Sequence, residues 1–224
     1  MLKPKKQLGT HKEIKQDKLV TYFFQAQDIF DKYKKPIIYG FLAIVAIVAA
    51  SAYSRSVSFN KEQEASVELA KGKTAYENAQ YQEATRILGP LTSKFSGTQS
   101  AGFGTILLAK SFLAQQQYDE AEQYFRTYLD DYDDKMLDLA AYIGLASCYD
   151  QKGEYDKAAK AYEEAANFDV ESFQAPELLL SAARCYQLAN DAVNAKRVLQ
   201  LMIEKYPAGQ SISTAKLMLA ELSL

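Results

Sequence analysis

A recurrence every 37 residues is the feature that most constrains the fold of this 224-residue chain. Four columns of side chains keep this spacing: a mostly aromatic position, an alanine three residues later, a large apolar position seven residues later, and a small residue nine residues earlier. In that order, the columns are Tyr81, Tyr118, Tyr155 and Ala192; Ala84, Ala121, Ala158 and Ala195; Leu88, Phe125, Tyr162 and Leu199; and Gly72, Ala109, Ala146 and Ala183. Because few turn residues interrupt this region, each repeat is predicted to be a helix hairpin that must stack on its neighbours.

Each column has a packing reason. The small residue lets two antiparallel helices approach closely, the alanine lets the second helix meet the next repeat, and the large side chains fill the space between them. The sequence therefore predicts an all-α fold, with a solenoid of about four hairpins over residues 65–224 and a capping helix over 211–222. The hairpins are predicted near 65–98, 102–135, 139–172 and 176–209. Gly89-Pro90 predicts an end or a kink in the second helix of the first hairpin.

An uncharged stretch of nineteen residues, from Pro36 to Ser54, precedes the repeats. In a helix it would be about 28 Å long, close to the thickness of the hydrocarbon core of a bilayer. It predicts a transmembrane helix over 36–54 with Pro36 in its first turn. One alternative is a buried core helix, although such helices rarely extend so far without a charge. The other is a signal peptide cleaved at Ala50-Ser51-Ala52, but about 35 residues precede the apolar run, too many for an ordinary signal peptide.

Charge predicts the orientation of this helix. Residues 1–35 contain nine lysines and four acidic residues, whereas the rest of the chain is net acidic. The positive-inside rule therefore places residues 1–35 in the cytoplasm and the repeats across the membrane, joined to the span by a linker over 55–64. The pattern before the span predicts an amphipathic juxtamembrane helix, which would lie at the lipid headgroups or against a partner. Its apolar residues are Leu19, Val20, Tyr22, Phe23, Phe24, Ile29, Phe30 and Tyr33.

One repeat resembles the tetratricopeptide repeat (TPR) motif almost in full. The matching residues are Leu145-Ala146, Tyr149, Gly153-Glu154-Tyr155, Ala158, Tyr162 and Ala165. The step of 37 exceeds the usual 34 by three, and the last repeat has Ala192 where tyrosine is expected. A lysine-rich tail, one span and a TPR domain beyond the membrane together resemble the ancillary subunits of the bacterial Sec translocon. This resemblance implies an inner-membrane protein whose periplasmic TPR domain contacts translocon subunits, exported or unfolded polypeptides and periplasmic chaperones.

The leading functional hypothesis is therefore a membrane-anchored scaffold that assists proteins leaving the translocon. The alternative is a TPR scaffold for envelope assembly or cell division that is unrelated to Sec, since the motif identifies a fold and no partner. An enzyme is disfavoured, because His11 is the single histidine and lies in the basic tail, and because no nucleotide-binding glycine loop or metal-ligand spacing is present. We therefore expect no catalytic residues, cofactor or metal site. The acidic repeat region also disfavours nucleic-acid binding.

Two further columns on the first helix of each hairpin predict a binding groove on the concave face. They lie one helical turn apart and should share a face. The aliphatic column is Leu69, Ile106, Ile143 and Leu180, and the largely basic column is Lys73, Lys110, Ser147 and Arg184. Such a groove would suit apolar or acidic unfolded segments. In the alternative interpretation, the aliphatic residues belong to the core and the basic residues form a solvated rim.

The two cysteines, Cys148 and Cys185, are also 37 residues apart and occupy equivalent places in adjacent repeats. Packed helices keep their axes about 8–10 Å apart, whereas a disulfide prefers Cα atoms within about 7 Å. We therefore predict two buried free thiols.

Overall fold

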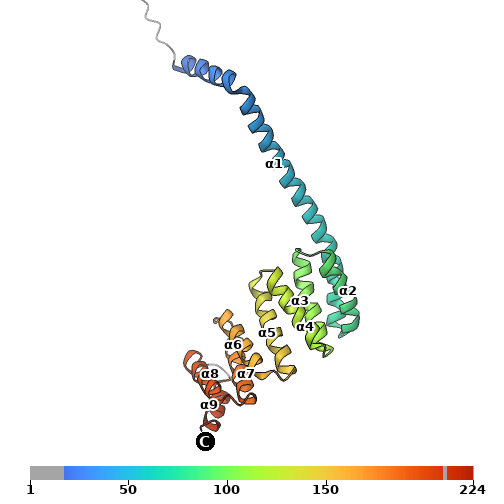
Figure 1. Cartoon of the computed structure of the whole chain (residues 1–224), viewed down its shortest axis with the longest axis vertical. Coiled ribbons are helices and arrows are strands. Elements are labelled where there is room, and N and C mark those ends of the chain that lie inside the picture. Colours follow the sequence, from blue (N-terminus) through green and yellow to red (C-terminus); the bar gives the residue numbers. More distant parts are fainter. Residues whose placement is uncertain (1–17, 209–210, 224) are drawn as a thin grey trace, which may run out of the picture. The chain divides into compact units, whose positions relative to one another are not determined.

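Nine α-helices, with connecting turns, make up the part of the chain that the computed structural model describes, residues 18–208 and 211–223 (Figure 1). The side chains of residues 18–21, 28, 31 and 37 lie outside this description. The helices are α1 (Lys18–Glu77), α2 (Tyr81–Lys94), α3 (Gln99–Ala114), α4 (Tyr118–Asp131), α5 (Lys135–Gln151), α6 (Tyr155–Phe168), α7 (Ala175–Leu188), α8 (Ala192–Lys205) and α9 (Ile212–Glu221).

The chain divides into two units, with the boundary between Ser56 and Val57. In the second unit, helices that are consecutive in sequence pack against each other from α2 to α9, and α3 also packs against α5. Together with the C-terminal part of α1, they form four hairpins followed by the single helix α9, so the predicted all-α solenoid is confirmed.

The apolar segment belongs to α1, and it is a candidate membrane span. Within the described residues, one helix, taken over Lys32–Glu77, is apolar and long enough to cross a bilayer, and none of its most apolar window is buried. This exposure argues against the alternative of a core helix. Two details differ from the prediction: Pro36 lies inside α1 and not in its first turn, and residues 55–64 are helical where we predicted a linker. Of the predicted basic tail, residues 1–17 lie outside the described residues.

Four equivalent turns connect the two helices of each hairpin. Their central residues, Ala79, Gln116, Gly153 and Asn190, recur every 37 residues, and each has a positive φ between 57° and 74°. At each turn the next backbone N–H donates to a carbonyl five residues earlier, at 2.8–2.9 Å, as in the Schellman motif that ends many helices. The four second helices then begin at the column that starts with Tyr81. The turns therefore set the 37-residue register in space.

The packing role predicted for the small, alanine and large columns is confirmed, because all twelve residues are buried. Two helix pairs approach closely where a glycine on one helix faces a large side chain on the other. A Cβ on Gly72 would lie 2.3 Å from Leu88 Cδ2, and one on Gly144 would lie 2.2 Å from Phe125 Cζ. These two helix pairs can approach as they do only because no side chain is present at the two glycines.

Gly89-Pro90 does not end helix α2, which continues to Lys94. Proline removes one helical hydrogen bond, but Leu88 and Leu91 on either side of the pair are 0% and 1% exposed. Burial of two leucines is worth roughly 3–6 kcal/mol, which is sufficient to offset the cost of an interior proline, about 3 kcal/mol.

Cys148 and Cys185 are buried free thiols, as predicted. Burial, the largest cause, raises the pKa of Cys148 to about 12 and that of Cys185 to about 11, with the carboxylates of Glu122 and Asp150 respectively adding to the shift. Both sulfurs are therefore protonated at neutral pH.

Replacing Gly153 by alanine tests the turn geometry. No atom lies within 4 Å of the position of the new Cβ, so the penalty comes from the positive φ alone. We expect Gly153→Ala to lower the free energy of unfolding by about 1 kcal/mol. Gly153→Asn should cost less, because asparagine tolerates this conformation and already occupies the equivalent turn at Asn190. Urea unfolding followed by circular dichroism measures both; equal losses for the two variants would contradict the explanation.

The thiols provide a second test. Because a disulfide-exchange reagent reacts with the thiolate, we expect no measurable modification of Cys148 or Cys185 at pH 8 in the folded protein. Both should react within minutes in 6 M guanidinium chloride. Rapid modification of the native protein would show that one of these sulfurs reaches solvent.

Candidate protein-binding groove

The predicted aliphatic column lies largely in the core. Ile106 is 1% exposed, and Leu69, Ile143 and Leu180 are half-buried against the apolar clusters of their hairpins. Ile143 also lines the largest of the described grooves, of about 1480 Å³, and Leu69 lines a smaller one of about 390 Å³.

Most side chains of the basic column already form ion pairs or hydrogen bonds within the protein. Lys73 Nζ lies 3.7 Å from Glu77 Oε1, and the Arg184 guanidinium forms an ion pair with Asp150. Ser147 Oγ donates a hydrogen bond to the Ile143 carbonyl at 2.9 Å. Lys110 is the exception: in the described part of the chain, no carboxylate or hydrogen-bond acceptor contacts its ammonium group. Burial lowers the pKa of Lys110.

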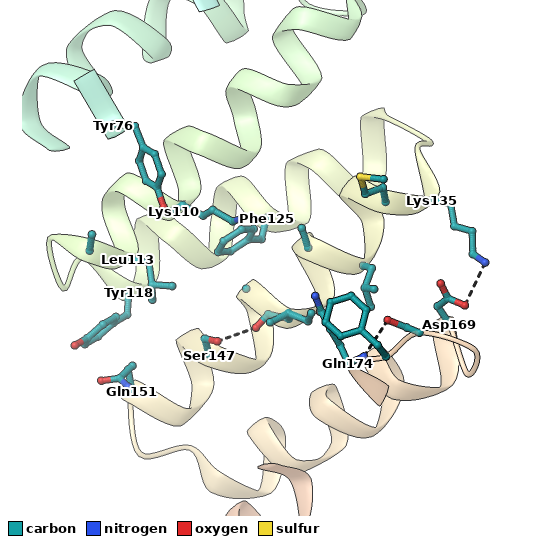
Figure 2. A pocket seen from close by; sticks show the side chains of 18 of the residues that line it. Tyr76, Lys110, Leu113, Tyr118, Phe125, Lys135, Ser147, Gln151, Asp169 and Gln174 are labelled. Carbon is teal, nitrogen blue, oxygen red and sulfur yellow. Dashed lines mark hydrogen bonds and ion pairs between the residues drawn. The ribbon is translucent and has the colours of Figure 1, made fainter. Parts of the chain in front are cut away.

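Three of the eight predicted residues, Lys110, Ile143 and Ser147, line one groove of about 1480 Å³ (Figure 2). The other five do not line it. Its floor is one face of α5, whose contributing residues recur at helical spacing. These floor residues are Met136, Leu139, Ala140, Ile143, Gly144, Ser147 and Gln151.

Two walls flank this floor. Tyr76 of α1, Lys110, Leu113 and Ala114 of α3, and Tyr118 at the start of α4 form one wall. The segment 169–174 between α6 and α7 forms the other. Figure 2 shows Lys110, Tyr118 and Gln151 on one side of the groove, and Lys135 and Asp169 on the other.

Local hydrogen bonds hold the second wall and the adjacent end of the floor. The Asp134 carboxylate caps α5 by accepting from the backbone N–H groups of Met136 and Leu137, at 3.0 and 3.2 Å. Tyr206 Oη donates to the Val170 carbonyl at 2.9 Å, and Lys135 Nζ lies 3.3 Å from Asp169 Oδ1. The wall is therefore fixed both from the start of α5 and from the residue that follows α8.

Sequence reasoning missed the most exposed apolar side chains of the groove. Met136 is 81% exposed and Phe173 is 87% exposed, and both line the groove beside Leu139. Neither belongs to a column used for the prediction, although the two residues are themselves 37 residues apart and so occupy equivalent places at the starts of adjacent hairpins. This shared register, with a large apolar residue at both positions, is the signal that could have identified them. Exposed apolar surface inside a concave site is typical of protein-binding surfaces.

A pair of truncations distinguishes core from groove. We expect Ile106→Ala to lower the free energy of unfolding by about 3 kcal/mol, because it leaves a cavity in a packed core. Met136→Ala should change it by less than about 0.5 kcal/mol, because the side chain is mainly in solvent. Denaturant unfolding of the two variants measures both values; a large loss for Met136→Ala would assign this residue to the core.

Comparison with known proteins agrees with this architecture. A model described as a tetratricopeptide repeat-like domain matches residues 27–176, and a tetratricopeptide repeat model matches 177–208. No curated protein sequence matches the chain.

Among solved structures, this chain resembles one assigned to a kinesin light chain of Podosopora anserina, which has nearly identical TPR-like repeats. The two superpose with a TM-score of 0.57 and 18% sequence identity, and the match covers 72% of this chain and 86% of that one. PcrH from Pseudomonas aeruginosa has a TM-score of 0.46 and 19% identity, over 57% of this chain and 95% of that one. At such identities, the first likeness shows the fold alone. Because the repeat-like model covers more than half of the sequence, the chain belongs to the tetratricopeptide repeat-like domain family.

Proposed function

We propose that this protein is a membrane-anchored scaffold that binds segments of other proteins in the groove over α5. TPR repeats are typically non-catalytic modules for protein–protein interaction, and the groove is the observation that carries the proposal for this chain. It combines exposed Met136 and Phe173 with a floor that is rigid because it is a helix of the solenoid. An extended apolar segment would bury these two side chains on binding.

The anchor in this proposal is residues 36–54. Two observations support it: the segment carries no charge, and its described side chains are exposed, as expected for a helix that meets lipid. The repeat-like family model also includes this segment, since it begins at residue 27. By the positive-inside rule, residues 1–35 would lie in the cytoplasm and the TPR domain in the periplasm.

We further propose that the scaffold is an accessory of the Sec translocon, which would pass exported proteins to periplasmic chaperones. The support is the order of a lysine-rich tail, one apolar segment and a TPR domain. Polypeptides that emerge from a translocon are unfolded and expose apolar residues, which is the chemistry that Met136 and Phe173 match.

Copurification tests this function. The full-length, C-terminally tagged protein, extracted in a mild detergent after crosslinking in intact cells, should bring translocon subunits with it. Phe173→Asp combined with Met136→Asp should reduce the yield of crosslinked exported polypeptides several-fold, because each places a charge against an apolar ligand. Val193→Asp is the matched control, since Val193 is 79% exposed on α8 outside the groove. Envelope-assembly or division proteins in place of translocon subunits would contradict the Sec assignment.

Protease digestion tests the topology. In sealed inside-out membrane vesicles, the C-terminal tag should resist protease until detergent is added, whereas an N-terminal tag should be digested at once. A C-terminal tag that is digested without detergent would place the TPR domain in the cytoplasm and overturn the orientation.

A further inference from the structure

The two ends of the groove differ in charge. At one end, the groove is lined by Lys110 with the polar side chains of Tyr76, Tyr118 and Gln151. The other end contains the apolar Met136, Leu139 and Phe173, together with the charged residues Lys135, Asp169 and Glu171.

Lys110 is distinct from its equivalents in the other repeats. Lys73 and Arg184 each pair with a carboxylate, and Ser147 carries no charge. Lys110 is half-buried, and no described residue forms an ion pair or hydrogen bond with its ammonium group. A partly desolvated cation without a counter-charge is unfavourable, and an anionic group of a ligand would relieve this cost with a charge-assisted hydrogen bond.

At the opposite end, Lys135 is neutralised by Asp169, at 3.3 Å. The Glu171 carboxylate therefore leaves this end with a net negative charge, beside exposed Met136 and Phe173. A ligand carboxylate is thus attracted to one end of the groove and repelled from the other, while an apolar side chain finds its largest contact at the repelling end.

The floor helix sets the distance between the two ends. Ser147 of α5 is the equivalent of Lys110 of α3, so it marks the level of Lys110 along the groove. Along α5, Met136 and Ser147 are separated by a rise of about 16 Å. An extended peptide covers this distance in about five residues.

We propose that the groove binds extended, acidic-apolar segments in one orientation, with a large apolar side chain against Met136 and Phe173 and a carboxylate at Lys110, about five residues away. This inference rests on the proposed protein-binding function and adds the chemistry of the ligand. The carboxylate belongs to an aspartate or glutamate side chain within the segment.

Synthetic peptides test the proposal on the full-length protein in lipid nanodiscs. Labelled peptides carry two phenylalanines in a glycine–serine background, with glutamate, glutamine or lysine five residues away, and each is made in both chain directions. By fluorescence anisotropy, the better glutamate peptide should bind at least about tenfold more tightly than its glutamine counterpart, as expected for one charge-assisted hydrogen bond. Moving the glutamate next to the phenylalanines should abolish this advantage.

Variants of the protein identify the cation. Lys110→Gln should remove the preference for glutamate, and Lys110→Glu should reverse it in favour of the lysine peptide. Lys160→Gln is the matched control, because it removes an equal charge from an exposed position on α6. The reversal in Lys110→Glu can arise only in a folded groove, so that loss of folding cannot imitate it.

The outcomes separate this inference from the function on which it rests. If Phe173→Ser weakens all peptides but glutamate has no advantage over glutamine, or keeps its advantage in Lys110→Gln, the groove binds apolar segments and the inference is wrong. If Phe173→Ser and Met136→Ser leave every affinity unchanged, the groove does not bind peptides and the proposed function fails as well.

Discussion

Close contact between a small residue on one helix and a large one on its partner underlies the whole repeat domain. Where the small residue is Gly72 or Gly144, the side chains of Leu88 and Phe125 occupy the space in which a Cβ would lie. This contact fixes the distance between helices, and with the four left-handed turns it fixes the angle at which each hairpin returns. The regular face of α5 that forms the groove floor is a consequence, because the floor is as rigid as the packing behind it.

Most of the fold could be predicted from the sequence, because packing at helix interfaces requires particular residue sizes at fixed intervals. The 37-residue columns gave the hairpins, the buried positions and the two free cysteines. The columns do not show whether the free energy of tertiary burial outweighs a poor local helix propensity. Gly89-Pro90 has a poor helix propensity, yet α2 continues because Leu88 and Leu91 are buried against other helices. Local sequence does not report that tertiary contribution.

The candidate groove was less predictable. Lys73, Lys110 and Arg184 occupy equivalent positions in the repeats. Whether each is paired depends on a nearby carboxylate, and Glu77 and Asp150 supply one to Lys73 and Arg184 respectively. Phe173 shares the register of Met136 but lies outside the columns used for the prediction, and its place in the wall depends on how the connection between α6 and α7 is held by Lys135 and Tyr206. Periodicity identifies equivalent positions, whereas the binding surface also depends on the neighbours that each position meets in its own repeat.

The turns at Ala79, Gln116, Gly153 and Asn190 also bear on the order in which the array assembles. Two of them place an ordinary side chain in a left-handed conformation, whereas the hairpin of α5 and α6 closes over glycine, which adopts it without strain. In a linear array, folding can begin at any unit and spread to its neighbours, so the unit that closes with least strain has an advantage. The hairpin that carries the groove floor is therefore the natural nucleus of the domain.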